Sequence, residues 1–136
     1  MTSRSEFLHD VFVTAIEGGI GYWSECSRYH WENGGGLTDL DLEGFYADIT
    51  DTEDTDKHYR ISRQTISRGV HLITSARGPF YDPNGANTQC VDVPYLDKGT
   101  AMCVWAGSVD NDASEIDAGI ADAIVQVCLF GEVRYG

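Results

Sequence analysis

Metal coordination is the first chemistry that the residue types of this chain allow. Asp39-x-Asp41-x-Glu43-Gly44 has the alternating oxygen ligands and the glycine with which an EF-hand loop begins. Such a loop also needs a bidentate glutamate at its twelfth position, where this chain has Thr50. We therefore interpret the segment as a solvated acidic loop. The four histidines have no zinc-binding spacing, so the sequence predicts neither a metal site nor a cofactor.

Nucleophilic and phosphate-binding motifs are the next possibility. The chain has no Gly-x-Ser-x-Gly elbow and neither of the glycine-rich loops typical of nucleotide binding. Gly18-Gly19-Ile20-Gly21 is glycine-rich, but it follows a predicted helix, whereas a phosphate-binding loop precedes one. We interpret these glycines as a helix end followed by close backbone packing. The sequence therefore predicts no catalytic residue and favours a protein that is not an enzyme.

Acidic residues far outnumber basic ones: 22 Asp and Glu against 9 Lys and Arg give a formal net charge of −13. Residues 39–56 contain eight acids and no base, whereas residues 57–77 contain five bases and no acid. Direct binding to nucleic acid or anionic lipid is disfavoured, because both need clustered Lys and Arg. A protein partner with a basic groove suits this charge. The candidate contacts to such a partner are Asp39, Asp41, Glu43, Asp48, Asp51, Glu53, Asp54 and Asp56.

Two other interpretations of the acidity stay open. Adjacent arms of a hairpin, one acidic and one basic, can partly neutralise each other. Many proteins are also acidic for solubility alone, without a partner that reads the charge. Neither alternative removes the excess of −13 over the whole chain.

The four cysteines, Cys26, Cys90, Cys103 and Cys128, are widely spaced and form no Cys-x-x-Cys pair. A chain of 136 residues can bury a core without covalent staples, so free thiols are favoured over disulfides. Cys26, Cys103 and Cys128 have apolar or aromatic neighbours, and we expect all three to be buried.

The clearest element is a helix near the N-terminus. Its apolar stripe at helical spacing consists of Phe7, Leu8, Val11, Phe12, Ala15 and Ile16. Ser3 or Ser5 can cap its start, and we expect Gly18-Gly19 to end it in a left-handed conformation. His9 lies beside the stripe and is expected to be a partly exposed packing residue.

Strands are predicted next. The aromatic composition of residues 20–31 is typical of a strand, and its aromatic side chains are expected in the core, although an exposed pair would mark an interface. These aromatics are Tyr22, Trp23, Tyr29 and Trp31. Residues 44–50 alternate, with Phe45, Ala47 and Ile49 on one face, as in a half-buried antiparallel strand. Asn33 to Gly36 is predicted to be a turn between these strands.

The acidic segment 51–56 is predicted to be the tip of a hairpin, with residues 57–61 returning as a short strand on which His58 faces solvent. Ser62 is expected to cap a helix that continues to about Ala76. All three prolines lie in residues 78–94, which we expect to be irregular.

Two further helices are predicted over about 95–107 and 114–130, the second ended by Gly131. Residues 133–135 are expected to add a terminal strand. These elements predict a single α+β domain over residues 1–136, in which a small antiparallel sheet of three or four strands is covered by about four helices.

Three segments resemble a group of small uncharacterised acidic proteins of actinobacteria and their phages. They are the stretch from Thr14 to Trp23, the stretch Thr65-Ile66-Ser67-Arg68-Gly69, and the closing stretch from Asp117 to Val133. The group has no known chemistry, so the resemblance transfers no functional residue. It implies a phage or mobile-element accessory protein that acts by binding a host protein.

The leading functional hypothesis is therefore a protein-binding domain, of which a nucleic-acid mimic or counter-defence inhibitor is the sharper form. A small-molecule or metal-dependent enzyme with a site assembled from scattered residues is one alternative, and a structural oligomer is another. We expect a cytoplasmic location, in the host cell if the protein is phage-encoded. The reason is that Glu6, His9 and Asp10 interrupt any signal peptide, and no apolar run reaches the roughly 20 residues of a membrane span.

Overall fold

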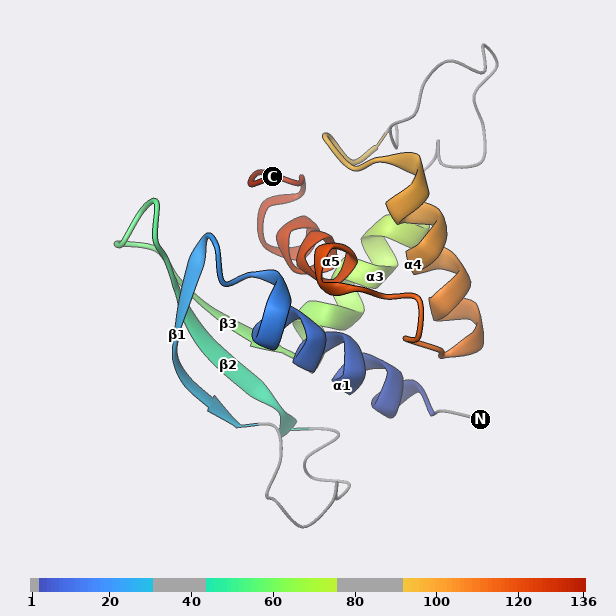
Figure 1. Ribbon diagram of the computed structural model, residues 1–136, viewed down its shortest axis with the longest axis horizontal. Coiled ribbons are helices and arrows are strands. Elements are labelled where there is room, and N and C mark those ends of the chain that lie inside the picture. Colours follow the sequence, from blue (N-terminus) through green and yellow to red (C-terminus); the bar gives the residue numbers. More distant parts are fainter. Residues whose placement is uncertain (1–2, 31–43, 76–91) are drawn as a thin grey trace.

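The computed structural model describes residues 3–30, 44–75 and 92–136. Within these residues, a three-stranded antiparallel sheet in the order β1-β2-β3 lies beside the helices, which confirms the predicted α+β class (Figure 1). The elements are α1 (Arg4–Thr14), η1 (Ala15–Gly19), β1 (Ser24–His30), β2 (Tyr46–Asp51), β3 (His58–Ser62), α3 (Arg63–Ser75), α4 (Lys98–Asp110) and α5 (Ala118–Phe130). The predicted turn at 33–36 and most of the loop predicted at 78–94 lie outside the described residues.

The first helix begins at the predicted serine and ends differently from the prediction. The Ser3 hydroxyl accepts a hydrogen bond from the Glu6 backbone N–H at 3.1 Å, which satisfies one donor of the first turn. The helix then widens into the π-helical turn η1. Neither Gly18 nor Gly19 is left-handed, so that prediction was wrong. A Cβ at Gly19 would lie 2.7 Å from the Ala118 carbonyl oxygen, and this close approach to α5 is what requires a glycine.

The β2–β3 hairpin confirms the predicted alternation. Phe45, Ala47 and Ile49 are buried, while the intervening side chains are only partly covered. Ile49 pairs with Tyr59 and Ala47 pairs with the buried Ile61, so β3 continues the same inner face. His58 is exposed, as predicted.

The predicted helix after Ser62 is α3, but Ser62 does not cap it in the expected way. The Thr65 hydroxyl instead accepts a hydrogen bond from the Ser62 backbone N–H at 3.0 Å, which is one half of a capping box. Further along α3, a Cβ at Gly69 would lie 2.2 Å from the Ile124 carbonyl oxygen. Only a glycine therefore allows α3 and α5 to cross at this distance.

Helices α4 and α5 confirm the two predicted C-terminal helices, although each begins about three residues later than expected. Asp97 and Asp117 are their N-caps. Gly131 ends α5 with φ 73°, the left-handed conformation that the sequence predicts there. The predicted strand at 133–135 is absent from the described structure. The backbone N–H of Val133 donates a hydrogen bond to the Pro94 carbonyl at 3.1 Å and not to a strand.

The predictions of burial for His9 and Cys26 were wrong. His9 is buried rather than partly exposed, and its ring meets Phe45 edge to face with centroids 5.4 Å apart. Cys26 is exposed rather than buried, because it lies on β1, an edge strand whose residues 25–29 are all exposed. Cys103 and Cys128 are partly buried, and these three thiols are free, as predicted.

Candidate functional site

The structure separates the acidic candidates of the hairpin into three environments. Glu53, Asp54 and Asp56 are exposed at the turn between β2 and β3, which Figure 1 shows projecting away from the helices. Asp48 lies on β2 and is paired with Arg60 of β3. Asp51 is 1% exposed. The remaining candidates, Asp39, Asp41 and Glu43, lie outside the described residues.

The Asp48–Arg60 pair is the predicted neutralisation between hairpin arms. Arg60 donates from Nε to Oδ1 at 2.7 Å and from Nη2 to Oδ2 at 3.0 Å. This bidentate contact lowers the pKa of the Asp48 carboxyl. Arg60 also lies over the Tyr46 ring, 4.3 Å from its centroid. Asp48 is therefore already occupied by a cation of its own chain.

Asp51 holds the turn rather than offering its charge to a partner. Its Oδ1 accepts the backbone N–H groups of Glu53 at 2.8 Å and of Asp54 at 3.3 Å. Its Oδ2 accepts the Tyr135 hydroxyl at 2.8 Å. The sequence predicts Asp51 as a contact to a partner. The structure shows that its carboxylate is not accessible, because it is buried and accepts hydrogen bonds from within the chain.

A second buried carboxylate, which sequence reasoning missed, lies on α5. Asp122 is 6% exposed, and three donors converge on it. Trp23 Nε1 donates to Oδ1 at 2.8 Å, the Tyr22 hydroxyl donates to Oδ2 at 2.6 Å, and Gln126 Nε2 lies within 3.0 Å of both oxygens. This network joins the segment before β1 to α5 across about 100 residues of sequence.

Tyr135, near the C-terminal end, connects the two buried carboxylates. Its backbone N–H donates to Gln126 Oε1 at 2.7 Å, and its carbonyl accepts from Gln126 Nε2 at 3.0 Å. Its ring stacks on Trp23 with centroids 5.3 Å apart, while its hydroxyl reaches Asp51. Tyr135 therefore connects α5 to Asp51, the last residue of β2, through its hydrogen bonds to Gln126 and Asp51.

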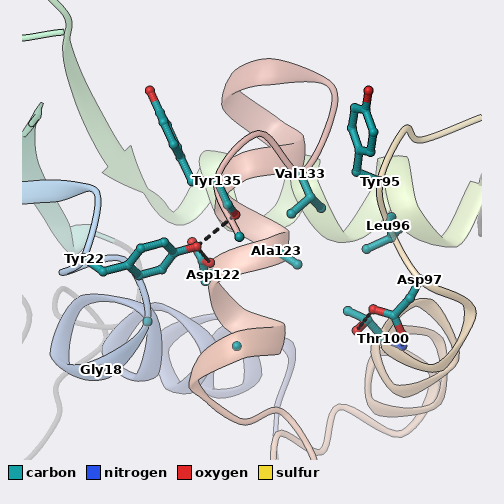
Figure 2. A pocket seen from close by; sticks show the side chains of 13 residues that line it. Gly18, Tyr22, Tyr95, Leu96, Asp97, Thr100, Asp122, Ala123, Val133 and Tyr135 are labelled. Carbon is teal, nitrogen blue, oxygen red and sulfur yellow. Dashed lines mark hydrogen bonds between the residues drawn. The ribbon is translucent and has the colours of Figure 1, made fainter. Parts of the chain in front are cut away.

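A cleft of about 520 Å³ opens beside Asp122. Figure 2 shows Tyr22 and Tyr95 on its two sides, with Asp97 and Thr100 below Tyr95. Tyr95 is 68% exposed and has a positive φ of 66°, an uncommon conformation for a bulky residue. The residues that line the cleft include two carboxylates but no lysine, arginine or histidine. Its chemistry therefore suits neutral donors or cations rather than anions.

Two ionisable groups of this cleft, Tyr22 and Asp97, have pKa values shifted away from neutral pH. Burial, together with the hydrogen bond to Asp122, raises the pKa of Tyr22 to about 12. The Thr100 hydroxyl and backbone N–H donate to Asp97 and lower the pKa of its carboxyl. A general acid or base works best with a pKa near the operating pH. Neither Tyr22 nor Asp97 is therefore matched to acid–base catalysis near neutral pH.

The tyrosine hydroxyls predict a loss of stability in alkali. Tyr22 and Tyr135 both have raised pKa values, Tyr22 mainly through burial and Tyr135 mainly through its hydrogen bond to Asp51. The folded protein then holds protons that the unfolded chain releases, so stability should fall between about pH 10 and about pH 12. We expect urea melts to show this slope, and Tyr22→Phe to reduce it.

Tyr29→Phe is the matched control for this experiment, because it removes an exposed tyrosine hydroxyl outside the Asp122 network. It should reduce the alkaline slope less than Tyr22→Phe does, because the Tyr22 hydroxyl donates to the buried Asp122. An equal slope in wild type and Tyr22→Phe would show that the Tyr22 hydroxyl does not couple to folding.

The predicted aromatic set divides between core and surface. Trp23 is 1% exposed and belongs to the core, whereas Tyr22 and Tyr29 are exposed and Trp31 lies outside the described residues. Asp122 had no usable sequence signal, because it lies among 22 acids and its donors are distant along the chain. The sequence pattern identifies its donors Tyr22 and Trp23 only as aromatic residues of a predicted strand.

Within the described residues, no group of three His, Cys, Asp or Glu side chains could hold a metal ion. No helix in the described ranges has the length and apolar character needed to cross a bilayer. Comparisons with protein-family models, with curated proteins and with solved structures found no match to this chain.

Proposed function

We propose that this protein binds a protein partner through the partner's basic surface and that the β2–β3 turn makes the contact. The observation that carries this proposal is the arrangement of the turn. Glu53, Asp54 and Asp56 are exposed, while the buried Asp51 fixes the backbone beneath them through two N–H groups. The acids are therefore presented from an ordered turn rather than from a loop that must first be ordered.

The charge of the turn is largely uncompensated. Residues 51–57 contain four acids and one base, Lys57. Arg60, the nearest base on β3, is occupied by Asp48. Exposed carboxylates of this kind steer a basic partner at long range and set the salt dependence of binding.

Mimicry of nucleic acid is the more specific form of this proposal. Carboxylates spaced along an ordered turn can occupy the phosphate sites of a nucleic-acid-binding groove. The resemblance to actinobacterial and phage accessory proteins supports a host protein as the partner, and a defence enzyme would make the protein a counter-defence inhibitor.

The test is capture from an actinobacterial lysate by the immobilised protein, washed first at low and then at high salt. We expect wild type to retain a host protein at low salt and to release it at high salt. The triple variant Glu53→Gln/Asp54→Asn/Asp56→Asn should retain about tenfold less, because steering and rim contacts both weaken.

The matched control removes the same three charges from the α1 side of the molecule, as Glu6→Gln/Asp10→Asn/Glu17→Gln. It should retain the partner as wild type does. Equal loss in both variants would show that only net charge matters and would contradict the role of the turn. Release of the captured protein by added duplex DNA would favour mimicry, and retention in its presence would count against it.

A further inference from the structure

Helix α4 has large apolar side chains on the face that points away from the core. Met102 is 43% exposed, Trp105 is 44% exposed and Val109 is 63% exposed. Ala106, between them, is also exposed. At 100° per residue these four positions fall within an arc of about 100°, which is the width of an apolar stripe that packs on another element.

This stripe is separate from the face that attaches α4 to the protein. The buried residues of α4 are Ala101, Val104 and Gly107, on the other side of the helix. Arg4 fixes the C-terminal end of α4, because its Nη1 donates to the Ser108 carbonyl and to Asn111 Oδ1, both at 3.0 Å. The stripe is therefore carried by a helix that is already held in place.

A rim of acids borders the stripe on one side. A cavity of about 270 Å³ lies there, lined by the following residues: Met102, Cys103, Ala106, Gly107, Asp110, Asp112 and Glu115. Its apolar residues are continuous with the stripe, and its outer residues are three carboxylates. An apolar surface beside fixed negative charge is complementary to an amphipathic segment that carries Lys or Arg along its edge.

We propose that this α4 face binds an amphipathic helix of a partner protein, with the partner's apolar side on Met102 and Val109 and its basic side towards Asp110 and Glu115. Met102 can adapt to the partner's side chains because it is unbranched, and Ala106 leaves room for a ridge of the incoming helix. The inference rests on the proposed function for the sign of the partner's charge, but it uses another surface. Figure 1 shows α4 and the β2–β3 turn on opposite sides of the molecule.

A second copy of this chain is a poorer occupant of the same face. In a two-fold antiparallel pair of α4 helices, the acidic end of one would meet the N-terminal end of the other. That end carries Asp97 beside Lys98, so one lysine and one aspartate would face the three acids of the other helix. Each chain also has a net charge of −13, which opposes self-association.

The experiment uses synthetic peptides of about 14 residues, or four helical turns, labelled for fluorescence anisotropy. The probe has Leu at helical spacing on one face and Lys on the other. The control peptide has the same residues in an order that destroys the apolar face. We expect the full-length protein to bind the amphipathic probe at least about tenfold more tightly than the scrambled peptide.

Two variants locate the binding. Met102→Ser/Val109→Ser should weaken binding of the probe by about tenfold or more, because it removes exposed apolar contacts without opening the core. Asp110→Asn/Glu115→Gln should weaken it by about threefold to tenfold and reduce its salt dependence. Glu53→Gln/Asp54→Asn removes the same charge from the hairpin turn and should leave the affinity unchanged.

Three results would overturn the inference. The probe and the scrambled peptide could bind equally, or the hairpin variant could weaken binding as much as the α4 variants do. The third is a concentration-dependent dimer in sedimentation equilibrium that Met102→Ser/Val109→Ser abolishes, which would identify a second copy as the occupant. Failure of the peptide assay together with salt-sensitive capture through the hairpin would leave the proposed function intact.

Discussion

Asp122→Ala is expected to lower the free energy of unfolding by about 3 kcal/mol in urea melts. The substitution removes the acceptor shared by Trp23 Nε1 and Gln126 Nε2, both of which are buried. A buried donor left without an acceptor costs about 1–3 kcal/mol. Trp23 Nε1 is left in that state, whereas Gln126 Nε2 keeps the Tyr135 carbonyl at 3.0 Å and contributes a smaller loss. The Tyr22 hydroxyl adds less, because Tyr22 is half exposed and its hydroxyl also lies 2.9 Å from the Tyr135 carbonyl.

Asp122→Asn is the informative companion variant. It keeps the size of the side chain and one acceptor oxygen, so we expect about half of the loss seen with alanine. A further control is Asp117→Asn, which retains an N-cap residue at the start of α5 and should change stability by less than about 0.5 kcal/mol. If alanine and asparagine at position 122 both cost less than about 1 kcal/mol, the network does not hold α5 to the sheet.

Phe12→Ala is expected to cost about 3–5 kcal/mol, the range typical of a fully buried phenylalanine. Phe12 is 0% exposed, and the centroid of its ring lies 4.5 Å from that of Phe45, the residue directly before β2. Truncation would therefore leave a cavity between α1 and the sheet. Denaturant melts give the loss directly, and near-ultraviolet circular dichroism shows whether the native packing survives.

Val109→Ala is the matched control for the loss of apolar volume, because Val109 is 63% exposed. It should change stability by less than about 0.5 kcal/mol. A cost below about 1 kcal/mol for Phe12→Ala would mean that the apolar stripe of α1 does not form the core contact that the structure shows.

The two proposed binding surfaces depend on different features of the chain. The hairpin turn needs Asp51 in the interior so that the neighbouring acids stay exposed in a fixed geometry. Helix α4 has apolar residues on its buried side and on its exposed side. Its apolar residues therefore do not form one stripe on a single face. Salt should weaken binding at the turn steeply and binding at the α4 stripe only in part.

The sequence by itself determined the elements whose signals are local. The stripe that begins at Phe7 predicted α1, the alternation around Ala47 predicted β2, and Gly131 predicted the end of α5. These succeed because periods of 3.6 and 2 residues follow directly from helix and strand geometry. Most of the α+β arrangement then follows, since each apolar face must be buried against another element.

Only the tertiary structure decided which acids are exposed and which are buried. Asp51 and Asp122 are indistinguishable by residue type from their exposed neighbours, and their partners Tyr135 and Tyr22 lie 84 and 100 residues away in sequence. The C-terminus failed as a predicted strand for the same reason, because its hydrogen-bonding partners are the side chain of Gln126 and the carbonyl of Pro94. Burial of a polar group depends on the donors that surround it in space, and no local pattern of residues records where those donors lie.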